Sequence, residues 1–538
     1  MADGGAAVTG LLRARIEQGY WPLARGRPAA GERAAFAAAY AQRDDPYYWS
    51  AAQGPTPQAL QFIDVLRAAG DAGLDPSDYD ADALVAAAGR LQATHGAAAT
   101  ADTVDFELRL TAAALRYALH LHGGRVSPRA AGYNLREGPA AVDTTPWLAE
   151  LASAVDVRAP IARIEPPFLH YRLLQQALIR YRALAASGDV VALPALPRRS
   201  LRAGDTYTGA PALRRLLVAL GDLPVEAATA DPADAVLDDA LVAALARFQA
   251  RHGFDPDGVL GRGTLAALNV PLPQRLLQIE LTLERWRWLP PFRPRQIVVN
   301  IPQFRLFALE SAEDRISGTL QMPVITGRAY KKTKTPVFTA DIEYVVFRPY
   351  WDVPRSIALG ELLPSIRRDP DYLERNQMEL VRGQADESPV VQASPENIDA
   401  LERGALRLRQ RPGEDNTLGL IKFVLPNDYG VYLHGTSGRR GFLLSRRDLS
   451  HGCIRVSEPA ELAAYVLRNE PGDWTPEAIE AATRAEVSQR VKLVQPVHVM
   501  LLYGTALATE DGRILFFDDI YGLDRRLAEL LRRAAVAS

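Results

Sequence analysis

The spacing of apolar residues changes near residue 294, and this change divides the sequence into two kinds of structure. Before it, segments such as 105–124 carry apolar residues at helical spacing. After it, apolar residues alternate, as in Ile297, Val299 and Ile301. A period near 3.6 predicts amphipathic helices and a period of 2 predicts strands. We therefore expect a multidomain α+β protein, helical in its first part and mostly β in its second.

The helical part divides in two. Residues 1–200 are rich in alanine and leucine and predict a helical N-terminal scaffold domain. The segment 186–205 then loses periodicity and gathers Pro, Gly and Arg, as linkers do. Beyond it, 211–223, 236–254 and a short segment ending at 269 predict a compact three-helix domain over 205–272.

The β part is expected to form one domain over 294–508, interrupted by an insertion. Residues 352–418 are charged, with helical patterns at 355–368 and 372–381 and a third helix capped by Ser394. Long insertions on a rigid scaffold are often lids, so we expect a helical capping insertion. A hairpin and a helix are expected over 509–538.

Composition excludes several classes of protein. A formal net charge of -2 argues against a nucleic-acid partner, and no window approaches the roughly 18 apolar residues of a membrane span. The N-terminus lacks the features of a secretory signal. The single cysteine, Cys453, cannot form an intramolecular disulfide, and alone it does not supply a zinc site.

Cys453 lies in the stretch SHGCIRV, where it is either a small buried hydrophobe or a nucleophile. A thiol has an unperturbed pKa of about 8.5, so attack at neutral pH requires a base. Two histidines qualify by sequence, His434 and His451. His434 ends an alternating segment and allows a strand, a loop and a return to the thiol, so we favour it as the base and interpret His451 as structural or substrate-side.

Glycine and arginine residues adjoin both motifs. Gly435 and Gly452 allow a close backbone approach, as convergence of amides on an oxyanion requires. Arg455 lies two residues beyond Cys453 on alternating structure and therefore on the same face. Since a guanidinium binds a carboxylate through two hydrogen bonds, Arg455 is our candidate carboxylate clamp.

The pair of stretches 434-HGT-436 and 450-SHGCIRV-456 closely resembles the catalytic signature of the L,D-transpeptidases. The segment 246-ARFQARHGFDPDGVLGRGTLAALN-269 likewise resembles a three-helix peptidoglycan-binding domain. The chain as a whole is similar to the large, multidomain L,D-transpeptidases of Gram-negative bacteria.

The resemblance implies a role for each candidate residue. Cys453 is the nucleophile, attacking as a thiolate, His434 the general base, and the carbonyl of Gly435 the group that orients the imidazole. The Cys453 amide, helped by the Gly452 amide or the Tyr432 hydroxyl, is expected to stabilise the oxyanion. Arg455 is expected to bind a carboxylate, and the other residues expected to contact substrate are Trp351, Ser450 and His451.

The same resemblance implies the substrate and the setting. The enzyme acylates itself with a peptidoglycan tetrapeptide stem at diaminopimelate, releases D-Ala, and passes the acyl group to a second stem. Carbapenems acylate the same thiol, and other cell-wall synthases are candidate partners. No metal and no organic cofactor is implied. The expected location is the periplasm, with an inner-membrane anchor.

Three alternatives stay open from the sequence. The first is a cell-wall cysteine peptidase or amidase, which needs the same thiol and imidazole. The second is a wall-binding scaffold whose catalytic signature is silent. A metal site formed by Cys453, His434 and His451 is a distant third, because no fourth ligand is evident.

Overall fold

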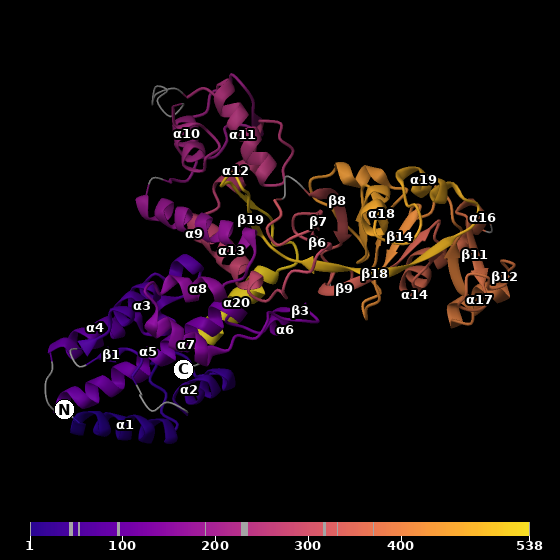
Figure 1. Ribbon diagram of the computed structural model, residues 1–538. Helices are drawn as coiled ribbons and strands as arrows, with labels where there is room; N and C mark the ends of the chain where they lie inside the picture. The colour runs from indigo at the N-terminus through magenta and orange to yellow at the C-terminus, as the bar shows by residue number, and fades with distance from the viewer. Residues whose placement is uncertain are drawn as a thin grey trace. The chain divides into compact units, whose positions relative to one another are not determined.

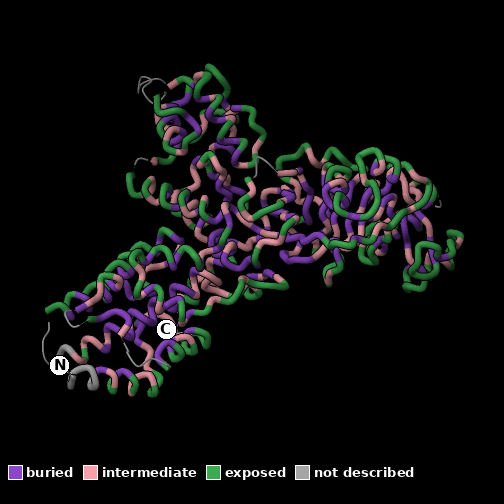
Figure 2. Tube along the Cα trace, in the orientation of Figure 1, coloured by how far each residue is buried: buried purple, intermediate pink, exposed green. Residues whose placement is uncertain are grey.

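The computed structural model describes residues 2–41, 47–51, 54–93, 97–188, 190–226, 235–315, 319–330, 332–369 and 371–536. The chain forms two compact units, one of Met1–Phe292 with Gly504–Ser538 and one of Arg293–Tyr503 (Figure 1). The first is mainly helical and the second is rich in strands, so the predicted multidomain α+β class is confirmed. In both, the buried positions lie along the interior of the fold (Figure 2).

The N-terminal part of the helical unit is built around α5 (Ala97–Gly123). Its apolar side chains, including Leu108, Leu115 and Leu121, are fully buried. The aromatic rings of Trp49 and Phe62 stack 5.8 Å apart in the same core. The other helices of this part are α1 (Ala2–Glu17), α2 (Ala30–Ala41), α3 (Pro57–Arg67), α4 (Ala81–Ala93), α6 (Pro128–Ala131), α7 (Thr144–Ser153), α8 (Arg158–Ile164) and α9 (Leu169–Ser187).

The expected three-helix domain consists of α10 (Ala210–Ala219), α11 (Asp239–Arg251) and α12 (Arg262–Leu268), with the short pair β4 (Ser200–Leu201) and β5 (Leu260–Gly261). One side chain explains much of its sequence motif. The Gln249 amide donates to Asp257 Oδ1 at 2.9 Å and to Thr264 Oγ1 at 3.2 Å, and its oxygen accepts from Gly258 N at 2.8 Å. Gln249 therefore holds the turn before α12 against α11.

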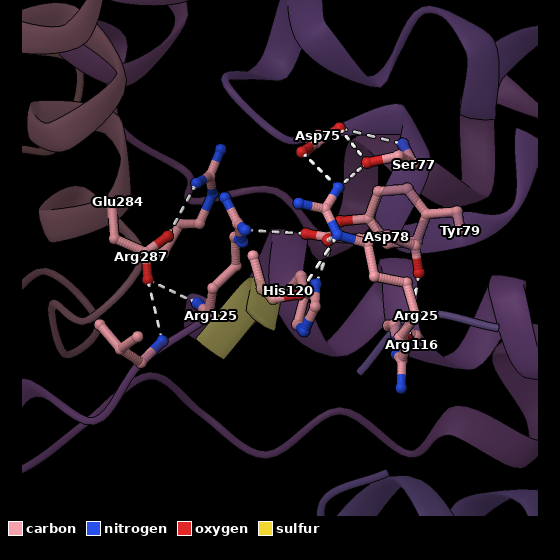
Figure 3. Close-up of polar contacts among 12 residues, drawn as sticks. Arg25, Asp75, Ser77, Asp78, Tyr79, Arg116, His120, Arg125, Glu284 and Arg287 are labelled. Atoms are coloured by element: carbon pink, nitrogen blue, oxygen red, sulfur yellow. Dashed lines mark hydrogen bonds and ion pairs between the residues drawn. The ribbon is translucent and has the colours of Figure 1, made fainter. Parts of the chain in front are cut away.

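Helix α13 (Leu272–Trp286) follows this domain and carries a buried polar cluster (Figure 3). Glu284 accepts from Arg287 at 3.2 Å and from the backbone N–H of Val126 at 3.2 Å. Arg287, fully buried, also donates to Tyr171 Oη at 3.2 Å and to the carbonyl of Ala72. These contacts join α13 to the N-terminal helices through buried polar groups.

The chain returns to the helical unit at its C-terminal end. Strands β19 (Ala506–Ala508) and β20 (Ile514–Phe516) form the expected hairpin, and α20 (Leu523–Val536) follows. Arg285 of α13 pairs with Asp524 of α20 at 2.6 Å. The strand-rich unit ends at Tyr503, and Gly504 lies between the strands Gln489–Leu502 and β19.

The strand-rich unit contains a ring of paired strands in the order β14–β15–β17–β8–β7–β6–β18–β9, closed by pairing of β9 with β14. β16 (Asp448–Ser450) pairs outside the ring with β8. Helices α18 (Pro459–Leu467) and α19 (Pro476–Arg484) complete the unit. The ring strands are β6 (Gln296–Asn300), β7 (Arg305–Leu309), β8 (Leu320–Gly327), β9 (Val337–Phe347), β14 (Ile421–Val424), β15 (Leu433–His434), β17 (Ile454–Val456) and β18 (Gln489–Leu502).

Alternation along these strands separates two faces. Phe423, Leu433 and Ile454 are fully buried, as are Ile297 and Val499, which the alternating pattern placed in strands. Their neighbours along each strand face the opposite side.

The insertion forms a small lobe with its own core, which includes Leu363, Leu380 and Leu408. Its predicted helix over 372–381 is only partly correct, because Met378–Val381 forms a strand that pairs with Arg407–Gln410. The cap at Ser394 is confirmed, since its side chain accepts from Asn397 N. The elements are β10 (Trp351–Asp352), α14 (Arg355–Ile357), a π-helical turn (Ala358–Leu362), α15 (Leu363–Arg368), α16 (Tyr372–Arg375), β11 (Met378–Val381), β12 (Val390–Val391), α17 (Pro395–Arg403) and β13 (Arg407–Gln410).

The two ends of the lobe are tied to each other. Fully buried Asn416 donates from Nδ2 to the carbonyl of Pro349 at 3.1 Å and to that of Arg411 at 2.8 Å. The lobe therefore leaves the ring of strands and returns to it at one place.

Candidate active site

Strand register places the candidate residues on one face of the ring. Lys422 of β14 lies opposite His434 of β15, and His434 lies beside Arg455 of β17. Since side chains alternate along a strand, Tyr432 shares the face of His434, and Cys453 shares that of Arg455. The backbone N–H of Ile454 donates to the carbonyl of Tyr432 at 3.1 Å. This bond continues the pairing of β15 with β17 to the residue that follows Cys453.

The His434 imidazole is buried, with 3% of its surface exposed, and its Nδ1 lies 2.5 Å from the carbonyl oxygen of Gly435. Burial, reinforced by the charge of Arg455, lowers the pKa of His434 to about 3, while the Gly435 contact opposes this shift. The ring is therefore neutral at pH 7. With Nδ1–H donating to Gly435, Nε2 keeps a lone pair that can accept a proton.

The Cys453 thiol is half-buried and donates to the carbonyl of Gly430 at an Sγ–O distance of 3.7 Å. Burial raises the pKa of this thiol above its usual value, against hydrogen bonds from Tyr432 and the charges of Lys422 and Arg455. The resting site thus holds a neutral thiol and a neutral imidazole. A thiolate–imidazolium pair is not its resting state.

The turn before Cys453 is held by Ser450. Its buried hydroxyl donates to the carbonyl of Cys453 at 2.6 Å and accepts from the N–H of Gly452 at 3.1 Å. Gly452 has a φ of 128°, a conformation that favours glycine. Ser450 therefore shapes the loop from inside, and the Gly452 N–H, which we expected to assist the oxyanion, is already engaged.

Thr335, which we did not single out from the sequence, supports the same loop from the segment before β9. Its hydroxyl donates to the carbonyl of Gly452 at 2.8 Å and accepts from Gly327 N at 2.9 Å. A Cβ at Gly327 would collide with the carbonyl of Thr333, so glycine is needed for this close approach. A lone threonine far from the cysteine motif gives no sequence signal of such a role.

Lys422 is the second residue that the sequence did not reveal. Its ammonium lies 4.1 Å from the centre of the Tyr432 ring, and that ring lies 5.5 Å from His434. Burial lowers the pKa of Lys422, against attraction to Cys453. Trp351, at the root of the insertion, hydrogen-bonds to Tyr432 and packs against the core of the lobe. The Trp351 side chain thus borders the site.

Arg455 and His451 differ in their surroundings. The Nε of Arg455 is buried and has no hydrogen-bond partner within the described parts of the chain. Such a donor is costly unless a ligand satisfies it. His451 is exposed, and its Nε2 lies 2.7 Å from Glu361 Oε1 on the π-helical turn of the insertion. It thus links the cysteine loop to the lobe.

Within the described ranges, no group of three or more His, Cys, Asp or Glu side chains is arranged to hold a metal ion. The chemistry available is that of a half-buried thiol, a neutral imidazole and two flanking cations. These groups fit acyl transfer to a thiol from a substrate that carries a carboxylate.

Comparisons with known proteins agree with this class of site. A model of an L,D-transpeptidase catalytic domain matches residues 294–488, a peptidoglycan-binding domain model matches 209–268, and a scaffold domain model matches 34–178. A curated protein of Haemophilus influenzae, named provisionally as an L,D-transpeptidase, is 30% identical over 250 residues, which is 46% of this chain and 48% of the relative. The chain thus spans about half the length of that relative.

The fold and site define a multidomain α+β protein with a thiol and an imidazole on one strand face. Its strand-rich unit matches the L,D-transpeptidase catalytic domain, and its helical unit contains a peptidoglycan-binding domain. Residues 294–488 thus match the L,D-transpeptidase catalytic domain, and residues 209–268 match a peptidoglycan-binding domain.

Proposed function

We propose that the protein is an L,D-transpeptidase that cross-links diaminopimelate residues of peptidoglycan through an acyl-enzyme on Cys453. The observation that carries this proposal is the strand face shared by Cys453, His434 and Arg455, in a domain of this family. The matches to a transpeptidase catalytic domain and to a peptidoglycan-binding domain support the proposal.

In the first step the neutral His434 accepts the thiol proton at Nε2 as sulfur attacks the donor carbonyl. In the structure the thiol donates to the carbonyl of Gly430. Proton transfer to His434 therefore requires the thiol to turn toward the imidazole when the donor stem binds. The carbonyl of Gly435 stabilises the imidazolium through Nδ1–H. The bond from the carbonyl carbon to the terminal D-Ala nitrogen then breaks, and the departing amine takes the proton from His434.

In the second step an amine of another stem attacks the thioester. His434 accepts one proton from this amine, the carbon–sulfur bond breaks, and the proton returns to Cys453. The charges of Lys422 and Arg455 stabilise the sulfur anion in both steps, since both lower the pKa of the thiol. The Tyr432 hydroxyl, which hydrogen-bonds to the sulfur, lies where it can also reach the oxyanion.

Arg455 fits the role of carboxylate clamp because its buried Nε lacks a partner in the described chain. We propose that the insertion limits access of water to the acyl-enzyme, since water would divert it to hydrolysis. The link between Glu361 and His451 fixes the lobe to the cysteine loop.

The domains that match peptidoglycan proteins favour a site of action at the cell wall, in the periplasm. No helix in the described part of the chain is long and apolar enough to cross a membrane. Inner-membrane anchoring and partnership with other cell-wall synthases stay predictions from family resemblance.

Intact-mass measurement after mixing with a carbapenem tests the nucleophile. Wild type is expected to gain the mass of one inhibitor molecule, and Cys453→Ser to gain none. An adduct on Cys453→Ser would contradict the assignment of the thiol. A wild type with no adduct would favour a catalytically silent scaffold.

Product analysis with a disaccharide-tetrapeptide distinguishes transfer from hydrolysis. Transfer gives a cross-linked dimer and free D-Ala. Free tripeptide without dimer would replace the transferase by a cell-wall peptidase that uses the same thiol.

A further inference from the structure

A groove of about 710 Å³ opens in the helical unit, apart from the thiol site. Its lining residues lie between 252 and 281 and between 516 and 532, so all belong to one compact unit. They come from the three-helix domain, α13, the end of the hairpin and α20. The volume falls within the range of roughly 300–1,000 Å³ typical of small-ligand sites.

Small side chains form one wall of the groove. Gly263, Ala266 and Ala267 of α12 line it, so a ligand can approach the backbone closely there. Helix α20 contributes Arg525, Ala528 and Arg532 to the lining of the groove. Residues at i, i+3 and i+7 share one helix face, and the short Ala528 separates the two guanidinium groups.

A third guanidinium, that of Arg275, lies within the groove. It stacks over the ring of Phe516 at 4.5 Å and donates to Gln278 Oε1 at 2.9 Å and to the carbonyl of Ala267 at 3.0 Å. All of these partners are uncharged. Burial lowers the pKa of Arg275 to about 10, and neighbouring Arg251 contributes. The charge of Asp518 also attracts Arg275, but the hydrogen bonds and the ring contact of its guanidinium given above all involve uncharged groups, so it can still bind an anionic ligand.

Two of the three acidic groups that line the groove are already engaged. Asp524 accepts from Arg285 at 2.6 Å and from Thr505 Oγ1 at 2.6 Å. Asp519 accepts from the backbone N–H groups of Leu523 and Asp524 at 2.8 and 3.1 Å. Asp524 is neutralised by Arg285, so Asp518 and Asp519 face three arginines and the groove keeps a small positive balance.

We propose that this groove binds the carboxylate-bearing stem peptide of peptidoglycan, so that the helical unit holds the polymer while the catalytic unit acts on it. The inference rests on the proposed wall-directed function, and the three arginines select the acidic stem rather than the uncharged sugars. The site belongs jointly to the peptidoglycan-binding domain, α13 and α20. The peptidoglycan-binding domain without α13 and α20 therefore lacks part of the groove.

Cosedimentation of the full chain with purified peptidoglycan sacculi tests the groove. The double variant Arg525→Glu/Arg532→Glu is expected to bind about tenfold more weakly, because two surface attractions become repulsions. Arg533→Glu is the matched control: it reverses an exposed charge on the same helix, next to Arg532 but outside the groove. Ala528→Trp, which fills the groove without changing charge, is expected to weaken binding as well.

Competition identifies the part of the polymer that is bound. Free tetrapeptide stem is expected to displace the protein from sacculi, and chitotetraose, which has no carboxylate, is expected not to. Displacement by chitotetraose alone would overturn the assignment to the stem. If Arg525→Glu/Arg532→Glu binds sacculi as tightly as Arg533→Glu, the groove is not the binding site.

Activity on a small soluble donor separates this inference from the proposed function. The groove variants are expected to keep the wild-type acylation rate, whereas Cys453→Ser is expected to bind sacculi normally and to form no acyl-enzyme. A wild type that binds sacculi but does not acylate would contradict the proposed enzyme and leave the groove supported. Groove variants that bind normally and acylate normally would contradict the groove and leave the enzyme supported.

Discussion

Lys422 and His434 lie directly opposite each other on β14 and β15, so the ammonium group and the imidazole share the face that carries Cys453. Burial lowers the pKa of both groups. The positive charge of Lys422 lowers the pKa of both the thiol and the imidazole. A lysine of this kind favours the thiolate and keeps the base neutral.

Lys422→Met is therefore expected to raise the pKa of Cys453 further. Thiol alkylation by iodoacetamide at neutral pH should slow about three- to tenfold, corresponding to a rise of roughly half to one pH unit. The rate should be recovered at higher pH. Lys492→Met, which removes an exposed lysine from β18, is the control and should leave the rate unchanged. A Lys422→Met profile equal to that of the control would refute this electrostatic role.

The pH dependence of acylation should report a neutral resting pair. Because the pKa of His434 is lowered to about 3 and that of Cys453 is raised, neither group changes charge near neutrality. We expect kcat/KM for a soluble donor to stay flat from about pH 5 to pH 8, without the inflection near 6.5 of an ordinary histidine. It should fall only at more acidic pH, as His434 gains a proton. A bell-shaped profile centred on neutral pH would instead indicate a preformed ion pair.

Thr335→Val tests how the support of the cysteine loop contributes to acylation, since it changes none of the reacting groups. The substitution keeps side-chain volume but leaves the carbonyl of Gly452 and the N–H of Gly327 without their hydroxyl partner. We expect acylation to slow about tenfold through misplacement of Cys453, and the free energy of unfolding to fall by about 1–3 kcal/mol. Carbapenem acylation kinetics and urea unfolding measure the two effects. Thr483→Val removes a half-buried hydroxyl that bonds to the carbonyl of Glu480 within α19, and it should change neither.

Glu284→Ala should destabilise the helical unit strongly. It removes the carboxylate that accepts from buried Arg287 and from the N–H of Val126, and leaves Arg287 only the uncharged acceptors Tyr171 and Ala72 described above. Removing one partner of a buried ion pair costs about 3–5 kcal/mol, measured as free energy of unfolding. Glu480→Ala, which breaks the exposed pair with Arg484, should cost less than about 1 kcal/mol. Similar losses for both variants would show that burial does not govern the contribution of Glu284.

Much of the fold follows from local sequence patterns. Alternation over 297–301 and 497–501 identifies strands because those residues have one buried face, and Ser394 marks a helix start through its own hydroxyl. The segment 378–381 was assigned to the wrong kind of element because its pairing with 407–410 depends on a strand distant in sequence. Helical spacing over so few residues does not exclude a strand.

The sequence predicts those residues of the candidate site that lie within short motifs. His434, Gly435, Cys453 and Arg455 come from two short stretches, and the structure brings them to one face; their roles stay predictions. Lys422 could not be identified in this way, because its relation to His434 is set by the register of β14 against β15. Register depends on the pairing of whole strands, which a single sequence does not display.

The tie between Asn416 and Pro349 has a consequence for how such a protein can change over time. Because the lobe enters and leaves at one point and packs around its own apolar centre, it can be lengthened, exchanged or lost while the ring of strands keeps its pairing. The lobe can therefore diverge independently, while the thiol, the imidazole and their supporting loop are inherited intact.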